Sequence, residues 1–105
     1  MEILYWNERV ERFIRGLDNE TKIRVEMTID LLEIRGYLLE MPDSKSLGKG
    51  LFELRTHGKE QVRIIYMFKN NLAIILHGFI KKSWKIPRKD MEYARQLQKD
   101  IMKLA

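Results

Sequence analysis

Arg55 and Arg63 are the residues of this chain whose type and spacing best suit the binding of an anion. They lie in the segment LFELRTHGKEQVRIIY, residues 51–66, where two apolar runs flank a polar gap that contains glycine. If the two runs pair as a hairpin, Arg55 lies opposite Arg63, and Glu53 lies opposite Ile65. Two guanidinium forks side by side match the oxygens of a phosphate, so this hairpin is a candidate phosphate site.

The expected register also sorts the side chains between the two faces of the sheet. Because side chains alternate along a strand, the arginines share an open face, and the buried face carries Phe52, Leu54, Ile64 and Tyr66. Like charges directly opposite each other destabilise a sheet by roughly a few tenths of a kcal/mol or more. Two explanations remain open: either Glu53, Glu60 or solvent compensates the pair, or the pair binds an anion.

A second group of cations follows the third apolar run, in the segment HGFIKKSWKIP. Alternation requires that either Lys81 or Lys82 faces the same side as the arginines. A lysine crowded by cations has a lowered pKa and can act as an acid or a base, although a lysine pair at a strand end also protects a sheet edge. Lys85 and Arg88 are candidate RNA-binding residues.

Three residues are candidates for proton transfer at the arginine pair. Glu53 is a possible base, and His77 or Tyr66 is a possible acid if its side chain reaches the open face. Each of these two also fits a packed position within a strand, and the expected register buries Tyr66. Trp84 either stacks on an RNA base or packs against the protein.

Several chemistries are excluded by composition. The chain has no cysteine and two histidines, so metal-ligand spacing and thiol nucleophiles are missing, and no glycine-rich phosphate loop follows a strand. Cleavage of RNA stays possible without a metal, because the substrate supplies its own nucleophile, the 2′-hydroxyl. The protein then has to align the attack, stabilise charge and move two protons.

The elements that position these residues follow from hydrophobic periodicity and turn signals. A short strand at residues 2–5 precedes two helices, one with an apolar face of Val10, Phe13, Ile14 and Leu17, the other with Ile23, Met27, Leu31 and Ile34 along one face, widened by Val25, Ile29 and Leu32. Residues 40–50 read as a connecting loop. Strands at 51–55, 62–68 and 72–80 form a meander, and Pro87 begins a helix with Met91, Ala94, Leu97 and Ile101 on its apolar face. The sequence therefore predicts an α+β fold.

Length and charge predict a single domain with a polyanionic partner. The chain has 105 residues, a net charge of +5 and an isoelectric point near 9.6, which favours nucleic acid or an acidic protein as partner. No apolar run is long enough to span a membrane, and the N-terminus lacks the pattern of a secretory signal. We therefore expect a cytoplasmic protein without a membrane partner.

Four sequence blocks together resemble the RelE/ParE superfamily of bacterial toxins, and most closely its HigB-like, phage-derived branch of RelE-type toxins. The blocks are LGKGLFELR, VRIIYMF, LHGFIKKSWKIP and EYARQL, and the resemblance runs from about Lys45 to the C-terminus. It implies one RelE-like toxin domain over residues 1–105, in which a short strand and a helical hairpin pack on an antiparallel sheet. It also implies a ribosome-dependent mRNA endonuclease of a type II toxin-antitoxin system, with no cofactor.

The resemblance implies partners and site residues as well. A cognate helix-turn-helix antitoxin is expected to neutralise the toxin, which would meet operator DNA only through that antitoxin. By position, Arg55 and Arg63 match basic residues of RelE-type enzymes, and Lys81 and Lys82 match the basic end of the last strand. Glu53 stands where some relatives have lysine, and no residue clearly matches the C-terminal tyrosine or histidine of several relatives.

Two other functions remain open from the sequence. One is a non-enzymatic binding protein, either a ParE-like gyrase poison or an RNA-binding module, since one fold hosts both nucleases and poisons. The other is a phage-derived remnant that still folds and binds its partner protein. The retained cluster of arginine and lysine favours the nuclease.

Overall fold

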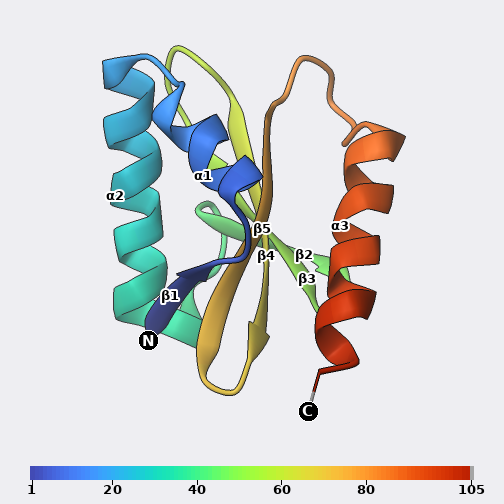
Figure 1. The fold of residues 1–105 in the computed structure, drawn as a ribbon. Coiled ribbons are helices and arrows are strands. Elements are labelled where there is room, and N and C mark those ends of the chain that lie inside the picture. Colours follow the sequence, from blue (N-terminus) through green and yellow to red (C-terminus); the bar gives the residue numbers. More distant parts are fainter. Residues whose placement is uncertain (105) are drawn as a thin grey trace.

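The protein folds as an α+β structure with one five-stranded mixed sheet and three α-helices (Figure 1). A computed structural model describes residues 1–104. The elements in chain order are β1 (Glu2–Tyr5), α1 (Glu8–Arg15), α2 (Asn19–Arg35), the 3₁₀-helix η1 (Gly36–Leu38), β2 (Ser44–Gly48), β3 (Leu51–Thr56), β4 (Val62–Lys69), β5 (Leu72–Ile80) and α3 (Arg88–Met102). The α+β class expected from the sequence is confirmed, and the fold is consistent with a RelE-like one.

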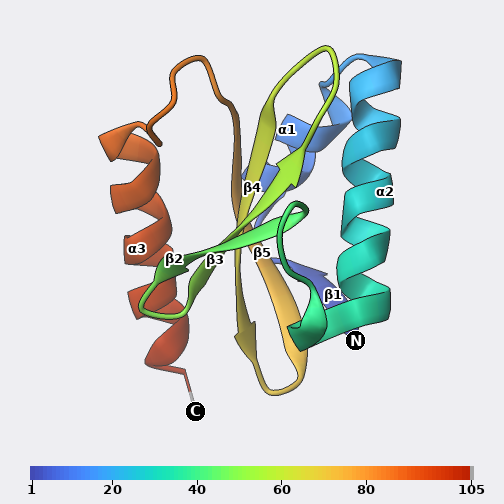
Figure 2. The ribbon, with the colours of Figure 1, turned by 180° about the vertical axis from the view of Figure 1, so that it is seen from behind.

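The sheet lies between two helical layers. Its strand order is β1-β5-β4-β3-β2, in which β1 is parallel to β5 and the other neighbours are antiparallel. The α1–α2 hairpin covers one face of the twisted sheet and α3 covers the other (Figures 1 and 2). One hydrophobic core lies under the hairpin and includes Val10, Val25, Leu54, Ile64 and Tyr66. A second lies under α3 and includes Leu51, Ile65, Leu76, Phe79 and Ala94.

The expected meander and its hairpin register are confirmed. Arg55 pairs with Arg63, and Glu53 pairs with Ile65. The turn between β4 and β5 has Asn70 and Asn71 with φ angles of 52° and 61°, the left-handed region that asparagine tolerates better than most residues.

A β-bulge in β5 changes the direction of the side chains near the end of this strand. Ile65 pairs with His77 and the next residue, Tyr66, pairs with Ile75, so Leu76 has no partner in the register. Leu76 consequently packs in the core under α3, and its neighbour His77 also reaches α3. An extra residue of this kind re-aims the side chains that follow it.

Residues 40–50 are not only a loop, as the sequence predicted, because β2 lies within them. Ser44 pairs with Leu54 and Ser46 pairs with Phe52, and the register shifts between Ser46 and Gly48. β2 is at the edge of the sheet, where short polar strands with lysine and a bulge are common. The sequence of such a strand lacks the alternation of apolar and polar residues from which strands are predicted.

The buried face of α2 also differs from the main stripe that the sequence predicted. Val25, Ile29 and Leu32 are buried, whereas Ile23, Met27 and Ile34 are 58%, 61% and 77% exposed. Both sets of residues follow helical spacing, so periodicity alone does not choose between them. The outcome leaves an apolar stripe on the outer side of α2.

The helix ends are fixed by polar caps. The side chain of Asn7 accepts a hydrogen bond from the backbone N–H of Val10, and Asp18 accepts one from Thr21, as is typical of N-cap residues. Pro87 precedes α3, which begins one residue later than the sequence predicted.

Within residues 1–104, no helix has the length and apolar character needed to cross a membrane.

Candidate active site

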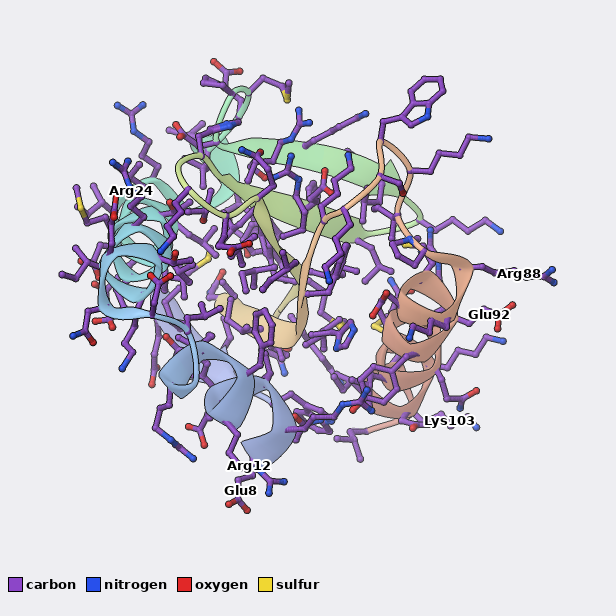
Figure 3. The ribbon with its side chains drawn as sticks, turned by 90° about the horizontal axis from the view of Figure 1, so that it is seen from above. Glu8, Arg12, Arg24, Arg88, Glu92 and Lys103 are labelled. Atoms are coloured by element: carbon purple, nitrogen blue, oxygen red, sulfur yellow. The ribbon has the colours of Figure 1, made fainter. Side chains whose placement is uncertain are left out.

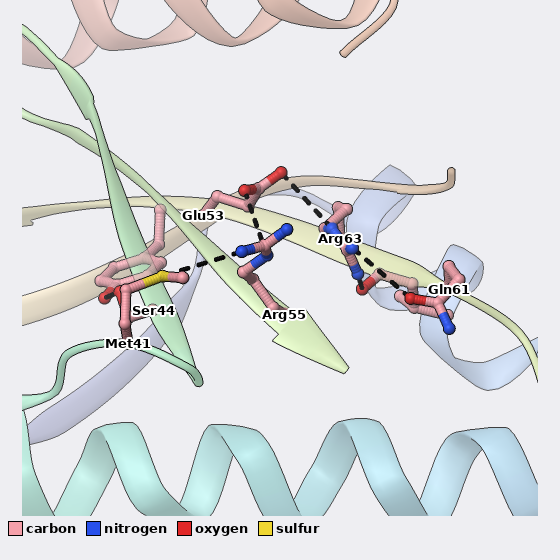
Figure 4. Close-up of polar contacts among 8 residues, drawn as sticks. Met41, Ser44, Glu53, Arg55, Gln61 and Arg63 are labelled. Carbon is pink, nitrogen blue, oxygen red and sulfur yellow. Dashed lines mark hydrogen bonds and ion pairs between the residues drawn. The ribbon is translucent and has the colours of Figure 1, made fainter. Parts of the chain in front are cut away.

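Arg55 and Arg63 lie side by side on one face of the sheet, with the carboxylate of Glu53 between them (Figure 4). The Nε atom of Arg55 is 3.8 Å from Oε2 of Glu53, and the Nε atom of Arg63 is 3.6 Å from Oε1. Both distances are ion-pair distances, longer than the 2.7–2.9 Å or so of a charge-assisted hydrogen bond. The three groups therefore form a loose charged cluster, which we call the Arg–Glu–Arg cluster.

Three polar atoms of the Arg–Glu–Arg cluster are buried without a hydrogen bond. These are Oε1 of Glu53 and the Nε atoms of Arg55 and Arg63, which within residues 1–104 have ion-pair contacts but no hydrogen-bond partner. Other atoms of the two guanidinium groups are bonded: Nη1 of Arg63 donates to the carbonyl of Val62, and Nη1 of Arg55 lies 3.7 Å from Sδ of Met41. A buried polar atom without a partner costs about 1–3 kcal/mol, so the cluster favours an added polar group.

The face that carries the arginines is less open than the sequence predicted. Arg63 and Glu53 are 4% and 3% exposed, because the same face carries α3 and the core around Ile65 and Phe79. The side chain of Arg55 is 21% exposed, so it is the most accessible member of the cluster. The first explanation for the arginine pair, compensation by Glu53, is present in the structure as two ion pairs. Neither of these ion pairs is short enough to be a hydrogen bond, so the hydrogen-bonding capacity of the three atoms remains unused.

Lys81 is the lysine of the pair that lies in the field of the Arg–Glu–Arg cluster. Its pKa is lowered by partial burial, and then by the neighbouring charges of Arg63 and Arg55, against the opposite effect of Glu53. Its backbone N–H donates a hydrogen bond of 2.7 Å to the carbonyl of Gln61, which fixes Lys81 beside the loop that joins β3 and β4. Burial also lowers the pKa of Arg63, with Arg55 adding to this effect. Lys82 lines a different cavity.

Tyr66 and His77, the two candidate acids, lie away from the Arg–Glu–Arg cluster. Tyr66 is 1% exposed in the core under the helical hairpin, on the face of the sheet opposite to Arg63, and its hydroxyl bonds that of Ser44. Burial raises the pKa of Tyr66. His77 lies on the α3 side, but its Nε2 atom is 2.6 Å from Oδ1 of Asp90.

The three candidate RNA-binding residues differ in their surroundings. Trp84 is 87% exposed, so it does not pack against the described part of the protein. Lys85, next to it, is also exposed. Arg88 pairs with Glu92 at 2.8 Å, and both side chains point outward from α3 (Figure 3). Trp84 and Lys85 are thus free to meet a ligand, whereas Arg88 faces away from the sheet.

Three residues that the sequence did not single out contribute to the Arg–Glu–Arg cluster or to the cavity lined by Lys82. Gln61 accepts a bond from Nη2 of Arg63 at 3.5 Å, and Arg9 and Asp90 line the cavity that contains Lys82. Their positions in different elements leave no spacing signal in the sequence. No group of three or more histidines, aspartates or glutamates in residues 1–104 is arranged to hold a metal ion.

An α+β fold with a helical hairpin on a mixed sheet is consistent with the fold of RelE-type toxin-like proteins. Residues 12–99 match the family model described as "Phage derived protein Gp49-like (DUF891)". This match covers most of the chain, and the protein therefore belongs to the Gp49-like phage-derived family. We find no match among curated protein sequences.

Proposed function

We propose that this protein is the toxin of a type II toxin-antitoxin system, of the HigB-like branch, and that it cleaves mRNA on the ribosome in the cytoplasm without a metal. The observation that carries this proposal is the Arg–Glu–Arg cluster, in which two arginines lie opposite each other and buried polar atoms have no hydrogen-bond partner. Membership of a family of RelE-type toxin-like proteins supports it. Expression in a sensitive host with mapping of new mRNA 5′ ends tests it.

The cluster, together with Lys81, supplies the groups that RNA cleavage requires. Arg55 and Arg63 hold the scissile phosphate and stabilise the extra negative charge of the transition state. Glu53, between them, takes the proton of the 2′-hydroxyl as its oxygen attacks the phosphorus. The bond from phosphorus to the 5′-oxygen breaks, and Lys81 gives this oxygen a proton. The products are a 2′,3′-cyclic phosphate and a 5′-hydroxyl.

The position of Glu53 suits it to act as the base. Its carboxylate lies between the two guanidinium groups, at 3.6 and 3.8 Å from their Nε atoms. A phosphate held by the same guanidinium groups would bring the 2′-hydroxyl of its nucleotide close to this carboxylate.

Lys81 as the acid predicts a specific pH dependence. The general acid must be protonated, so cleavage is expected to fall as the pH rises through the pKa of Lys81, which partial burial and Arg63 lower. Lys81→Arg keeps the positive charge but holds its proton over the whole accessible range. The variant should therefore lose this alkaline decline, which pH–rate profiles of purified protein on programmed ribosomes will measure. An alkaline decline that is unchanged in Lys81→Arg would exclude Lys81 as the acid; Lys89→Arg, an exposed lysine in α3, is the control.

The segment after β5 is suited to hold RNA beside the cluster. Trp84 offers an exposed indole on which a base can stack, and Lys85 adds a cation next to it. Lys81 begins this segment and lies near the arginines. RNA that crosses the cluster can therefore reach these side chains.

We propose that the cognate antitoxin, a helix-turn-helix protein, binds the exposed apolar stripe of α2. The stripe consists of Ile23, Met27 and Ile34 of α2 and continues to Leu38 of η1. These side chains are 58–80% exposed, and an apolar helix face fits such a surface. A cavity of about 210 Å³ next to the stripe is lined by Met27, Leu31 and Arg55. A partner helix on the stripe can thus place an acidic side chain at Arg55 and block phosphate binding, in accord with the net charge of +5 of this chain.

Substitutions in the stripe should separate toxicity from neutralisation. Met27→Glu and Ile34→Glu place charges in the proposed interface and leave the core unchanged, because both positions are exposed. We expect the variants to arrest growth like the wild type but to resist neutralisation, with at least about tenfold weaker antitoxin binding in a pull-down or calorimetric titration. Asp100→Lys on α3 is the control. Full neutralisation of both stripe variants would place the antitoxin elsewhere.

A further inference from the structure

A second polar site lies at the end of β5, between α1 and α3. It is a cavity of about 400 Å³ whose polar lining comes from Arg9, His77, Lys82 and Asp90. β1 pairs with β5 only over Leu72–Ile75, so the edge of β5 beyond this point is not covered by a strand. Seen from above, α1 and α3 lie on either side of the end of β5 (Figure 3).

A buried ionisable pair is fixed at the wall of this cavity. His77 and Asp90 are joined at 2.6 Å, and their side chains are 7% and 12% exposed. The imidazole is held further by Phe79, at 6.1 Å between ring centroids, and by Tyr93, at 4.9 Å with the rings nearly perpendicular. The Oδ1 atom of Asp90 is bonded to His77, and within residues 1–104 no group hydrogen-bonds its Oδ2 atom. The carboxylate is therefore held in place through Oδ1, and Oδ2 remains available to a donor.

Arg9 is fixed at the same cavity by a separate set of contacts. Its guanidinium carbon lies 4.2 Å from the centre of the Tyr93 ring, and the Tyr93 hydroxyl accepts a hydrogen bond of 3.2 Å from Asn7. Asn7 is also the N-cap of α1, the helix that carries Arg9. A guanidinium stacked on a ring keeps its N–H donors in the plane, free for a ligand.

The cavity is next to the Arg–Glu–Arg cluster along the sheet. Phe79 of β5 lines the cavity and pairs with Arg63 of β4. Lys81, near the cluster, and Lys82, at the cavity, are consecutive residues. A polyanion bound at the arginines therefore has a basic path into the cavity.

We propose that this cavity binds a guanine base of the RNA, next to the phosphate held by Arg55 and Arg63, and so gives the cleavage its sequence preference. Guanine carries an amino donor on one edge and the acceptors O6 and N7 on another. Asp90 receives the donor, and Arg9 donates to the acceptors. Adenine and cytosine carry an amino donor but no pair of adjacent acceptors on a separate edge, and uracil carries no amino donor. The inference rests on the proposed function for its RNA substrate, but nucleotide binding can be measured without cleavage.

Nuclear magnetic resonance titration of the full chain with the 5′-monophosphates of guanosine, adenosine, cytidine and uridine tests this inference. The four ligands share one phosphate, so differences between them report on the base. We expect the guanosine nucleotide to bind at least about tenfold more tightly than each of the others and to shift the imidazole signals of His77. Equal binding of all four would overturn the proposal.

Asp90→Asn gives the matched variant, since the amide keeps an oxygen that can accept a bond from His77. It should bind all four nucleotides with similar affinity, whereas Asp100→Asn, an exposed position on the same helix, should keep the guanine preference. A merely structural role of Asp90 would change thermal stability and leave the preference intact, which would contradict the inference. If the protein cleaves no RNA but the guanine preference depends on Asp90, the nuclease proposal fails and the base site stands.

Discussion

Arg63→Ala is expected to lower the rate of mRNA cleavage by about 10²- to 10³-fold and to relieve growth arrest. Arg63 lies opposite Arg55 in the sheet, and its Nε atom is buried without a hydrogen-bond partner. A phosphate in the cluster would use this donor, and the contact becomes stronger as negative charge develops in the transition state. Cleavage by purified protein on programmed ribosomes measures the loss directly.

Two further variants make this result interpretable. Arg63→Lys keeps the charge but not the planar fork, and it should recover only a small part of the rate if two parallel hydrogen bonds to the phosphate are needed. Arg88→Ala removes an exposed arginine that pairs with Glu92, and it should cleave like the wild type. Circular dichroism must show that Arg63→Ala is folded. Unchanged growth arrest by folded Arg63→Ala would refute the role of the cluster.

Glu53→Gln should have the second large effect, on stability. The substitution leaves two positive charges on the buried face without their carboxylate, and breaking a buried ion pair costs about 3–5 kcal/mol. We expect about 3 kcal/mol, because the side chain of Arg55 is 21% exposed to solvent. For a chain of this size, such a loss lowers the melting temperature by roughly 12 °C or more.

Inorganic phosphate should partly reverse this loss. A phosphate bound between the arginines replaces the missing negative charge, so it should raise the melting temperature of Glu53→Gln more than that of the wild type. Glu92→Gln is the matched control, since its pair with Arg88 is exposed and should contribute little. Equal stabilisation of all three proteins by phosphate would argue against an anion site between Arg55 and Arg63.

The hairpin register was predictable because several local signals agreed. Leu54 and Ile64 could be buried together only if Arg55 faced Arg63, and a register shifted by one residue would have exposed these apolar side chains. The resemblance of the surrounding blocks to RelE-type toxins pointed to the same fold. Local pattern and tertiary packing thus specify the same strands.

Other features depend on contacts that a single sequence does not display. α2 has two apolar stripes, and only packing on the sheet selects the one with Val25, Ile29 and Leu32. The burial of Arg63 depends on where α3 lies. The pair of His77 and Asp90 joins a strand to a helix through a bulge at Leu76, which no spacing rule reveals.

Mapping the 5′ ends of mRNA in cells that express the wild type or Arg63→Ala, with detection of the chemistry of each end, tests the central claim most directly. The account predicts new ends with 5′-hydroxyl groups inside coding regions for the wild type, and their absence for folded Arg63→Ala. Growth arrest by the wild type without such ends, or the same ends in both strains, would contradict it.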